Sequence, residues 1–300
     1  MSLINIEHLT KDYDSGRGLF DINLTVEKGE VFGFVGTNGA GKTTLIRHLL
    51  GFLKPQQGKI TINGLDCWNA SAEIHKAVGY IPGEIAFPDE ATGSSFLKAQ
   101  AELLGIRDMA YAEYLIAKLQ LDPTANLKRM SKGMKQKTAI VAALMHDPDI
   151  LIFDEPSTGL DPLMRANFIE IVNEEKKKGK TIFMSSHMFE EVENTCDQVA
   201  MIKEGKIIAI ASTEDIRHNE NKTYKIEFST IHDLLRFTHE KVEFNEIRKA
   251  QNQALVTVND SGINEFTSLL VNYDIKFITE IEYTLDKYFK SLYQEEKQYV

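Results

Sequence analysis

Long apolar runs are missing from this sequence. The longest uninterrupted one is Ala139–Met145, far short of the roughly 20 residues that a membrane-spanning helix needs. Met1–Thr10 alternates apolar and polar residues and lacks the basic start and apolar centre of a secretory signal. We therefore expect no membrane span and no signal peptide in this chain.

Cysteine and positive charge are also scarce. Cys67 and Cys196 lie far apart and match no metal-ligand spacing, so we expect two reduced thiols in a cytosolic protein. The formal net charge is −10, and the basic triplet Lys176–Lys178 falls at an expected helix end, where it complements the helix dipole. An acidic chain is repelled by a phosphate backbone, which argues against nucleic acid as a partner.

Apolar runs alternate with helical patterns over residues 1–210. This is the pattern of an α/β fold, with helices packed around a sheet. Apolar residues make up 43% of the chain, enough for a full core. The runs that predict strands are Leu3–Leu9, Ile22–Val26, Val31–Val35, Lys59–Ile62, Val78–Ile81, Ile150–Phe153, Thr181–Met184 and Val199–Ile202.

Helical periodicity fills much of the remainder of this region. Asp161 as N-cap and Pro162 at the first helical position mark one helix start. Residues 93–121 are helical in pattern throughout, so we expect a helical subdomain, about residues 85–147, to interrupt the sheet. The predicted helices are Lys42–Leu50, Ser94–Leu104, Ala110–Gln120, Met134–Met145 and Pro162–Lys178.

A polar segment, Ser212–Asn221, marks a domain boundary. We expect one domain over residues 1–215 and a small C-terminal α+β appendage over residues 222–300. Its predicted strands are Tyr224–Phe228, Ala254–Val258 and Ile275–Ile281, and its predicted helices are Ile231–His239, Ile263–Asn272 and Leu285–Gln294.

A glycine-rich loop follows the apolar run that ends at Val35 and opens a helix. Its backbone N–H groups and the helix N-terminus behind them suit a β-phosphate. Lys42 adds a charge for the β- and γ-phosphates, and the Thr43 hydroxyl can bind Mg²⁺. The loop therefore predicts binding of ATP with Mg²⁺. Its expected contact residues are Gly36, Asn38, Gly39, Ala40, Gly41, Lys42, Thr43 and Thr44.

A second apolar strand, Ile150–Phe153, ends in two carboxylates. Ligands of open α/β sheets gather at the carboxyl ends of the strands, where Asp154 and Glu155 would lie. We expect Asp154 to support the Mg²⁺ shell and Glu155 to polarise the water that attacks the γ-phosphate. Alone, such a strand end is more often a turn, but the phosphate loop favours the catalytic interpretation.

The order of the motifs resembles the nucleotide-binding subunit of ABC transporters over residues 1–210 at least. Met130–Gln136 matches the family signature, usually Leu-Ser-Gly-Gly-Gln, and precedes Asp154-Glu155 by the family spacing. Ser157–Asp161 is similar to the D-loop and Ser185–His187 to the switch-histidine segment. The resemblance implies a P-loop NTPase fold of the ABC ATPase kind.

The resemblance also implies residue roles. Tyr13 stands at the place of the aromatic that stacks on adenine, and His187 at that of the γ-phosphate sensor. Ser131 and Gly133 would face the γ-phosphate held by the opposite subunit, and Asp161 would form an intersubunit contact. Each has a simpler alternative: an exposed aromatic for Tyr13, a polar side chain near a helix start for His187, and helix caps for Ser131 and Asp161.

Two departures separate this sequence from the family pattern. Lys132 and Met134 replace the usual glycine and glutamine of the signature, although Ser131 and Gly133 are retained. In the Q-loop segment, Gly83 stands where glutamine is expected. Either the neighbouring Glu84 approaches Mg²⁺ or the attacking water instead, or it only caps a loop.

As a whole, the resemblance implies a cytoplasmic ATPase, peripheral on the inner face of the cell membrane. It would work as a homodimer or heterodimer, hydrolyse MgATP at a head-to-tail interface and drive a separate transmembrane permease. The segment Tyr283–Phe289 resembles the C-terminal end of separately encoded exporter ATPases, so export is expected. The alternatives are a soluble ABC ATPase acting on ribosomes or DNA and, more remotely, a P-loop kinase or GTPase. The cargo cannot be read from the sequence.

Overall fold

A computed structural model describes residues 2–14, 16–88, 91–218 and 220–298. The chain divides into two compact units, Met1–Ser212 (unit 1) and Thr213–Val300 (unit 2). We describe each unit by itself.

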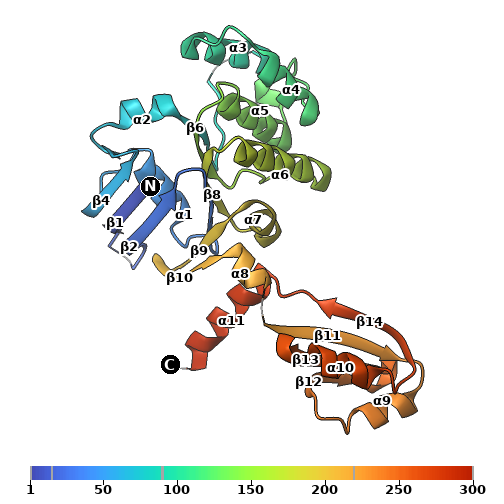
Figure 1. The fold of residues 1–300 in the computed structure, drawn as a ribbon. Coiled ribbons are helices and arrows are strands. Elements are labelled where there is room, and N and C mark those ends of the chain that lie inside the picture. The colour runs from blue at the N-terminus through green and yellow to red at the C-terminus, as the bar shows by residue number, and fades with distance from the viewer. Residues whose placement is uncertain (1, 15, 89–90, 219, 299–300) are drawn as a thin grey trace. The chain divides into compact units, whose positions relative to one another are not determined.

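The central sheet of unit 1 has the strand order β10-β9-β3-β8-β7-β6 (Figure 1). Its strands are β3 (Val31–Val35), β6 (Val78–Ile81), β7 (Ile150–Asp154), β8 (Thr181–Ser186), β9 (Gln198–Lys203) and β10 (Lys206–Ser212). All are parallel except the edge strand β10, which is antiparallel to β9. Every residue of β3, β7 and β8 is buried, as both faces of a parallel sheet are covered. Their carboxyl ends meet at one edge, which is where the phosphate loop and Glu155 begin.

A second, antiparallel sheet of order β2-β1-β4-β5 packs on the same core. Its strands are β1 (Ser2–Asp12), β2 (Gly18–Glu27), β4 (Gln57–Ile62) and β5 (Leu65–Asp66). Helix α1 (Lys42–Leu49) buries Leu45, Ile46 and Leu49 in the cluster that joins both sheets. Burial of a Leu or Ile side chain contributes about 1.5–3 kcal/mol. The helix that follows the phosphate loop is therefore fixed by its apolar side.

The remaining helices of unit 1 are α2 (Ser71–Ala77), α3 (Gly93–Leu104), α4 (Ala110–Lys118), α5 (Lys132–Leu144), α6 (Pro162–Lys177) and α7 (Phe189–Thr195). Helices α3, α4 and α5 gather at the end of the unit that is green in Figure 1, in the region where the sequence predicts a helical subdomain. Ser131 and Asp161 cap α5 and α6, accepting hydrogen bonds from the backbone N–H of Met134 (3.2 Å) and Met164 (2.9 Å).

Unit 2 contains a β-α-β-β-α-β arrangement with the strand order β12-β13-β11-β14, the ferredoxin-like topology. Helices α9 and α10 lie on one side of this antiparallel sheet (Figure 1), where Ile226, Phe228, Phe237 and Val256 form its core. The elements are α8 (Thr213–Arg217), β11 (Asn221–Phe228), α9 (Ile231–Phe237), β12 (Glu243–Arg248), β13 (Gln253–Asn259), α10 (Ile263–Leu270), β14 (Ile275–Ile281) and α11 (Leu285–Gln298).

Several short elements were not predicted from the sequence. Strand β12 reads Glu-Phe-Asn-Glu-Ile-Arg and is mostly exposed at a sheet edge, so its pattern lacks the alternation of a half-buried strand. Helix α2 buries only Ile74, and such a helix has no apolar stripe to detect. The segment expected to be a polar boundary holds α8. Elements β5, β10 and α7 were missed as well.

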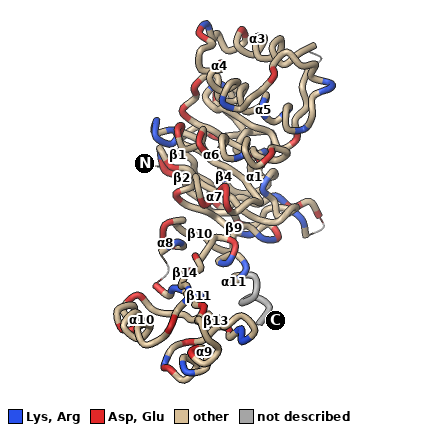
Figure 2. Tube along the Cα trace, turned by 90° about the vertical axis from the view of Figure 1, so that its right-hand side faces the viewer, with Lys and Arg blue, Asp and Glu red and all other residues tan. Residues whose placement is uncertain are grey.

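Within the described ranges, no helix combines the length and the apolar character needed to cross a bilayer. Basic and acidic residues are interspersed along the trace in Figure 2 rather than separated into two faces. No broad stripe of basic residues is visible along the described trace in that view.

Candidate functional site

The phosphate loop lines a pocket of about 670 Å³ at the carboxyl edge of the central sheet of unit 1. Gly39 (φ 82°) and Gly41 (φ 114°) have left-handed backbone conformations, which favour glycine because it has no Cβ. Gly41 is also the N-cap of α1, so the positive end of that helix faces the pocket. This geometry suits the phosphate groups of a nucleotide.

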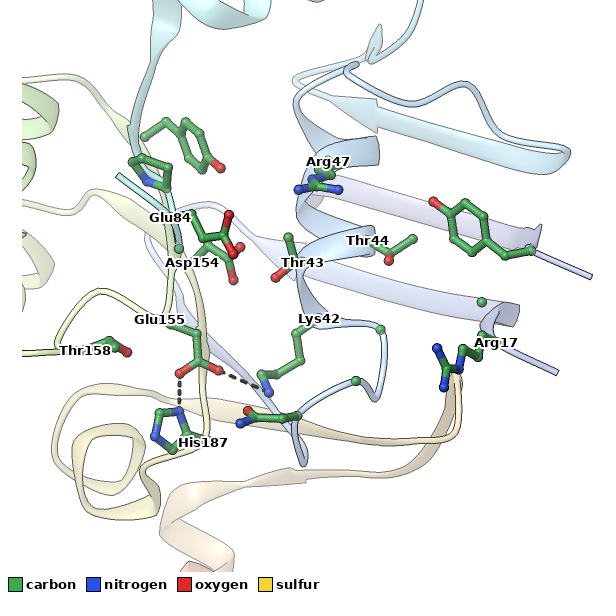
Figure 3. Close-up of a pocket in the computed structure, with 18 of the residues that line it drawn as sticks. Arg17, Lys42, Thr43, Thr44, Arg47, Glu84, Asp154, Glu155, Thr158 and His187 are labelled. Carbon is green, nitrogen blue, oxygen red and sulfur yellow. Dashed lines mark hydrogen bonds and ion pairs between the residues drawn. The ribbon is translucent and has the colours of Figure 1, made fainter. Parts of the chain in front are cut away.

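Lys42 and Glu155 meet inside this pocket. Lys42 Nζ donates hydrogen bonds to the carbonyls of Gly36 (2.7 Å) and Thr37 (3.2 Å), and lies 3.1 Å from Glu155 Oε1. The other carboxylate oxygen of Glu155 contacts Nδ1 of His187 (Figure 3). Glu155 thus bridges the lysine of the phosphate loop and the predicted switch histidine.

Backbone geometry aims Glu155 at the pocket. Its φ of 52° is left-handed, uncommon for a residue with a side chain and often found at functional sites. Its N–H donates to both the carbonyl and the hydroxyl of Ser185, each at 3.1 Å. The end of β7 is therefore held by β8.

Asp154 offers a carboxylate oxygen toward the pocket. Its Oδ1 accepts a 2.6 Å hydrogen bond from Ser185 Oγ, whereas its buried Oδ2 has no hydrogen-bond partner. Figure 3 shows Thr43 and Glu84 beside it. Carboxylate and hydroxyl oxygens are the donors that Mg²⁺ prefers, and an unpartnered buried oxygen is costly unless a cation binds it. The residues present therefore fit a Mg²⁺ ion.

The departure in the Q-loop segment has a structural counterpart. A Cβ placed on Gly83 would lie 3.0 Å from Asp154 Oδ2, closer than an ordinary van der Waals contact. Glu84 is exposed and lines the pocket. The position of Glu84 is therefore compatible with the first alternative, in which its side chain approaches the metal site.

Predicted site residues fall into two groups. The pocket is lined by Tyr13, Asn38, Gly39, Gly41, Lys42, Thr43, Thr44, Glu84, Asp154, Glu155 and His187. Its lining does not include Gly36 and Ala40, which are buried in the loop, nor Ser131, Gly133 and Asp161. The structure thus brings the phosphate-loop and hydrolytic residues together and leaves the signature and D-loop contact residues outside this pocket.

Some lining residues were not predicted from the sequence. Arg17 and Arg47 border the pocket and add positive charge to its rim (Figure 3). Arg17 lies between two glycines just after Tyr13, and the Tyr13 N–H donates to its carbonyl (2.9 Å), so a turn signal was present. Lys132 and Thr158 also line the pocket; they lie within the segments that resemble the signature and the D-loop, although neither was predicted as a contact residue.

A buried carboxyl group, that of Glu191, lies close in sequence to His187. Glu191 Oε2 accepts a hydrogen bond from Ser186 Oγ (2.7 Å), and that hydroxyl also accepts from the N–H of Met188 (2.9 Å). Burial raises the pKa of Glu191 from 4.5 to about 7. These bonds fix the backbone on either side of His187.

Comparison with known proteins agrees with this geometry. Residues 19–158 match the family described as ABC transporter. The chain is 41% identical over 206 residues to the ABC transporter ATP-binding protein NatA of Bacillus subtilis, a match that covers 67% of this chain and 84% of NatA. It is 32% identical over 297 residues to the bacitracin transport ATP-binding protein BcrA of Bacillus licheniformis, covering 97% of each chain.

A solved structure shows the same fold. The ATP binding subunit of an ABC transporter, 33% identical, superposes with a TM-score of 0.65 over 72% of this chain and 92% of that chain. The predicted α/β P-loop NTPase core is thereby confirmed. The chain belongs to the ABC transporter family, in which it is an ATP-binding and ATP-hydrolysing subunit.

Proposed function

We propose that this chain hydrolyses MgATP at a head-to-tail interface with a second ATPase subunit and so drives a separate transmembrane permease on the inner face of the cell membrane. One observation carries the proposal. Glu155 contacts both Lys42 and His187 inside the pocket, whereas Ser131 lies outside it. A single chain therefore holds the hydrolytic residues without the signature serine.

Within one subunit, Tyr13 stacks on adenine and the backbone of the phosphate loop binds the phosphates. Thr43 and Asp154 would hold Mg²⁺, and the ion would supply positive charge to the phosphate groups. The unpartnered Oδ2 of Asp154 supports this assignment. Glu84, exposed beside it, takes part in the same metal shell or in orienting the attacking water.

The ion pair between Lys42 and Glu155 suggests how hydrolysis is controlled. The ammonium of Lys42 is 5% exposed and already held by Glu155 and two carbonyls. A γ-phosphate bears more negative charge than a carboxylate, so it competes for Lys42. Glu155 is then released to orient water, while His187 positions the phosphate.

The second subunit completes the site. Ser131 and Lys132 are exposed at the N-terminus of α5, and a helix N-terminus binds anions. We infer that Ser131 and Gly133 reach the γ-phosphate of the other subunit, with Asp161 in the contact between subunits. Whether the partner is identical or a related chain does not alter this geometry.

We infer export from the resemblance of Tyr283–Phe289 to exporter ATPases, and the full-length similarity to a protein described as a bacitracin transport ATP-binding protein supports a transport role. The similarity covers 97% of each chain and therefore includes the C-terminal region. We take residues 1–215 as the ATPase domain and residues 222–300 as an accessory domain that supports the dimer.

The test is Glu155→Gln, which keeps the shape of the side chain and removes its charge. We expect this variant to bind MgATP and form a dimer that persists, while its turnover falls at least about 100-fold, since general-base assistance contributes about 10²–10⁴-fold. Turnover is measured by phosphate release, and the dimer by light scattering after size-exclusion chromatography.

Glu73→Gln is the matched control, since Glu73 is exposed on α2 away from the pocket lining, and it should behave as the unmodified chain. Full turnover by Glu155→Gln would remove the catalytic assignment of Glu155. A Glu155→Gln variant that binds MgATP but remains a monomer would instead refute the head-to-tail dimer.

A further inference from the structure

Unit 2 contains a cavity of about 320 Å³ beside its sheet. Its floor includes Thr223 of β11 and Leu255 of β13. Side chains alternate along a strand, and the neighbours Tyr224, Ala254 and Val256 belong to or pack against the core on the helix side. Thr223 and Leu255 therefore point to the opposite face, where α8 and α11 supply the walls.

Part of this cavity is apolar. Leu255 is only half-buried, although it stands in the middle of the central strand β13. Ile281, at the end of β14, is paired with Thr223, and both side chains line the cavity together with Tyr283. A volume of 320 Å³ lies at the lower end of the range for small-molecule sites, about 300–1,000 Å³.

The charged part of the lining is mostly positive. Arg217, Lys222 and Lys287 line the cavity together with one carboxylate, that of Glu280, and Lys222 is also ion-paired at 3.1 Å with Asp260, a half-exposed residue outside the lining. This excess is notable in a chain of net charge −10. Lys287 Nζ donates to the backbone carbonyl of Glu282 (2.6 Å), a contact that orients the ammonium without neutralising it.

We propose that this cavity binds a small organic anion with an apolar body. Leu255, Ile281 and Tyr283 contact the body, and Lys287 pairs with its carboxylate, sulfonate or phosphate group. The ligand anion also competes with the exposed carboxylate of Asp260 for Lys222. Arrangements of apolar walls with a few convergent polar groups are typical of ligand sites. The site belongs to unit 2 alone and is independent of the ATP pocket.

The test uses two aromatic probes in full-length protein saturated with MgADP, which occupies the ATP pocket. 8-Anilinonaphthalene-1-sulfonate is anionic, and N-phenyl-1-naphthylamine has the same rings without the sulfonate. We expect the double variant Lys222→Gln/Lys287→Gln to raise the Kd of the sulfonate about tenfold or more, since two charge-assisted contacts are lost. The Kd of the uncharged probe should change less than about threefold.

Lys225→Gln/Lys276→Gln is the matched control, because both lysines lie in the same sheet but outside the cavity lining, and it should bind both probes as the unmodified protein does. Leu255→Trp, which fills the cavity, should weaken both probes. Unchanged sulfonate binding in Lys222→Gln/Lys287→Gln or in Leu255→Trp would overturn the proposed site. Equal losses of both probes in the lysine variant would overturn the anion preference.

Discussion

The buried carboxyl group of Glu191 makes the stability of unit 1 dependent on pH. Its side chain is 1% exposed, and one of its oxygens, Oε1, has no hydrogen-bond partner. Burial raises its pKa from 4.5 to about 7, an effect opposed by hydrogen bonds from Ser186 and Ser157 and by the charge of Arg165, and reinforced by the charge of Glu155. The group is therefore easier to protonate in the folded chain than in the unfolded one.

The sign of the effect follows from the pKa values. Between about pH 4.5 and pH 7 the folded state holds a proton that the unfolded state has lost, so the free energy of unfolding falls as pH rises through this window. With a pKa of 4.5 unfolded and about 7 folded, the decrease from pH 5 to pH 8 is about 2–3 kcal/mol. Above the folded pKa the loss is complete.

Glu191→Gln removes this titration and can still accept the hydrogen bond from Ser186. We expect the stability of the variant relative to the unmodified chain to improve by about 2–3 kcal/mol on going from pH 5 to pH 8. Urea unfolding can be followed by tryptophan fluorescence, because the single tryptophan, Trp68, lies in unit 1. The signal therefore reports on the unit that contains Glu191.

Glu190→Gln is the control, since Glu190 is the exposed neighbour on α7. It should change stability equally at both pH values. If the stability difference between Glu191→Gln and the unmodified chain is the same at pH 5 and pH 8, Glu191 does not hold a proton near neutrality. The electrostatic argument would then be refuted.

Two further predictions concern the ATP site. Glu84→Ala should raise the Mg²⁺ concentration for half-maximal turnover about tenfold, because a hard oxygen ligand is lost; an unchanged Mg²⁺ dependence in phosphate-release assays would leave Glu84 as a loop residue only. Lys42→Ala and Ser131→Ala should each be inactive alone, yet an equal mixture should regain about a quarter of full turnover through one intact site in each mixed dimer. A mixture as inactive as its components would contradict head-to-tail sharing between two copies of this chain.

The sequence was sufficient to predict which contiguous motifs line the pocket. The phosphate loop and the strand ending in Asp154 and Glu155 are contiguous motifs, each bounded by an apolar run. The contact between Glu155 and Lys42 could not be predicted in the same way, because its geometry depends on the left-handed backbone at Glu155 and on the hydroxyl of Ser185. The order of the motifs predicted that Glu155 and Lys42 lie near each other, but it did not predict that they form an ion pair.

The sequence did not predict elements that bury few side chains, or pocket residues whose contacts are with parts of the chain far away in sequence. Strand β12 is an edge strand with a polar sequence, and α2 buries one side chain. Arg17 reaches the pocket from a loop and Lys132 from the first turn of α5, and packing elsewhere in the fold decides how both approach it. Hydrophobic periodicity shows which face of a helix or strand is buried. It does not show which loop packs against that helix or strand.

The close approach of Gly83 to Asp154 has an evolutionary consequence. A side chain at position 83 would begin 3.0 Å from the carboxylate oxygen Oδ2, so a larger residue there requires a small shift of the Asp154 carboxylate. Glycine at 83 and glutamate at 84 are thus best understood as a coupled pair, one residue making room and its neighbour supplying the polar group. Substitutions at the two positions should therefore be non-additive in their effect on the metal site.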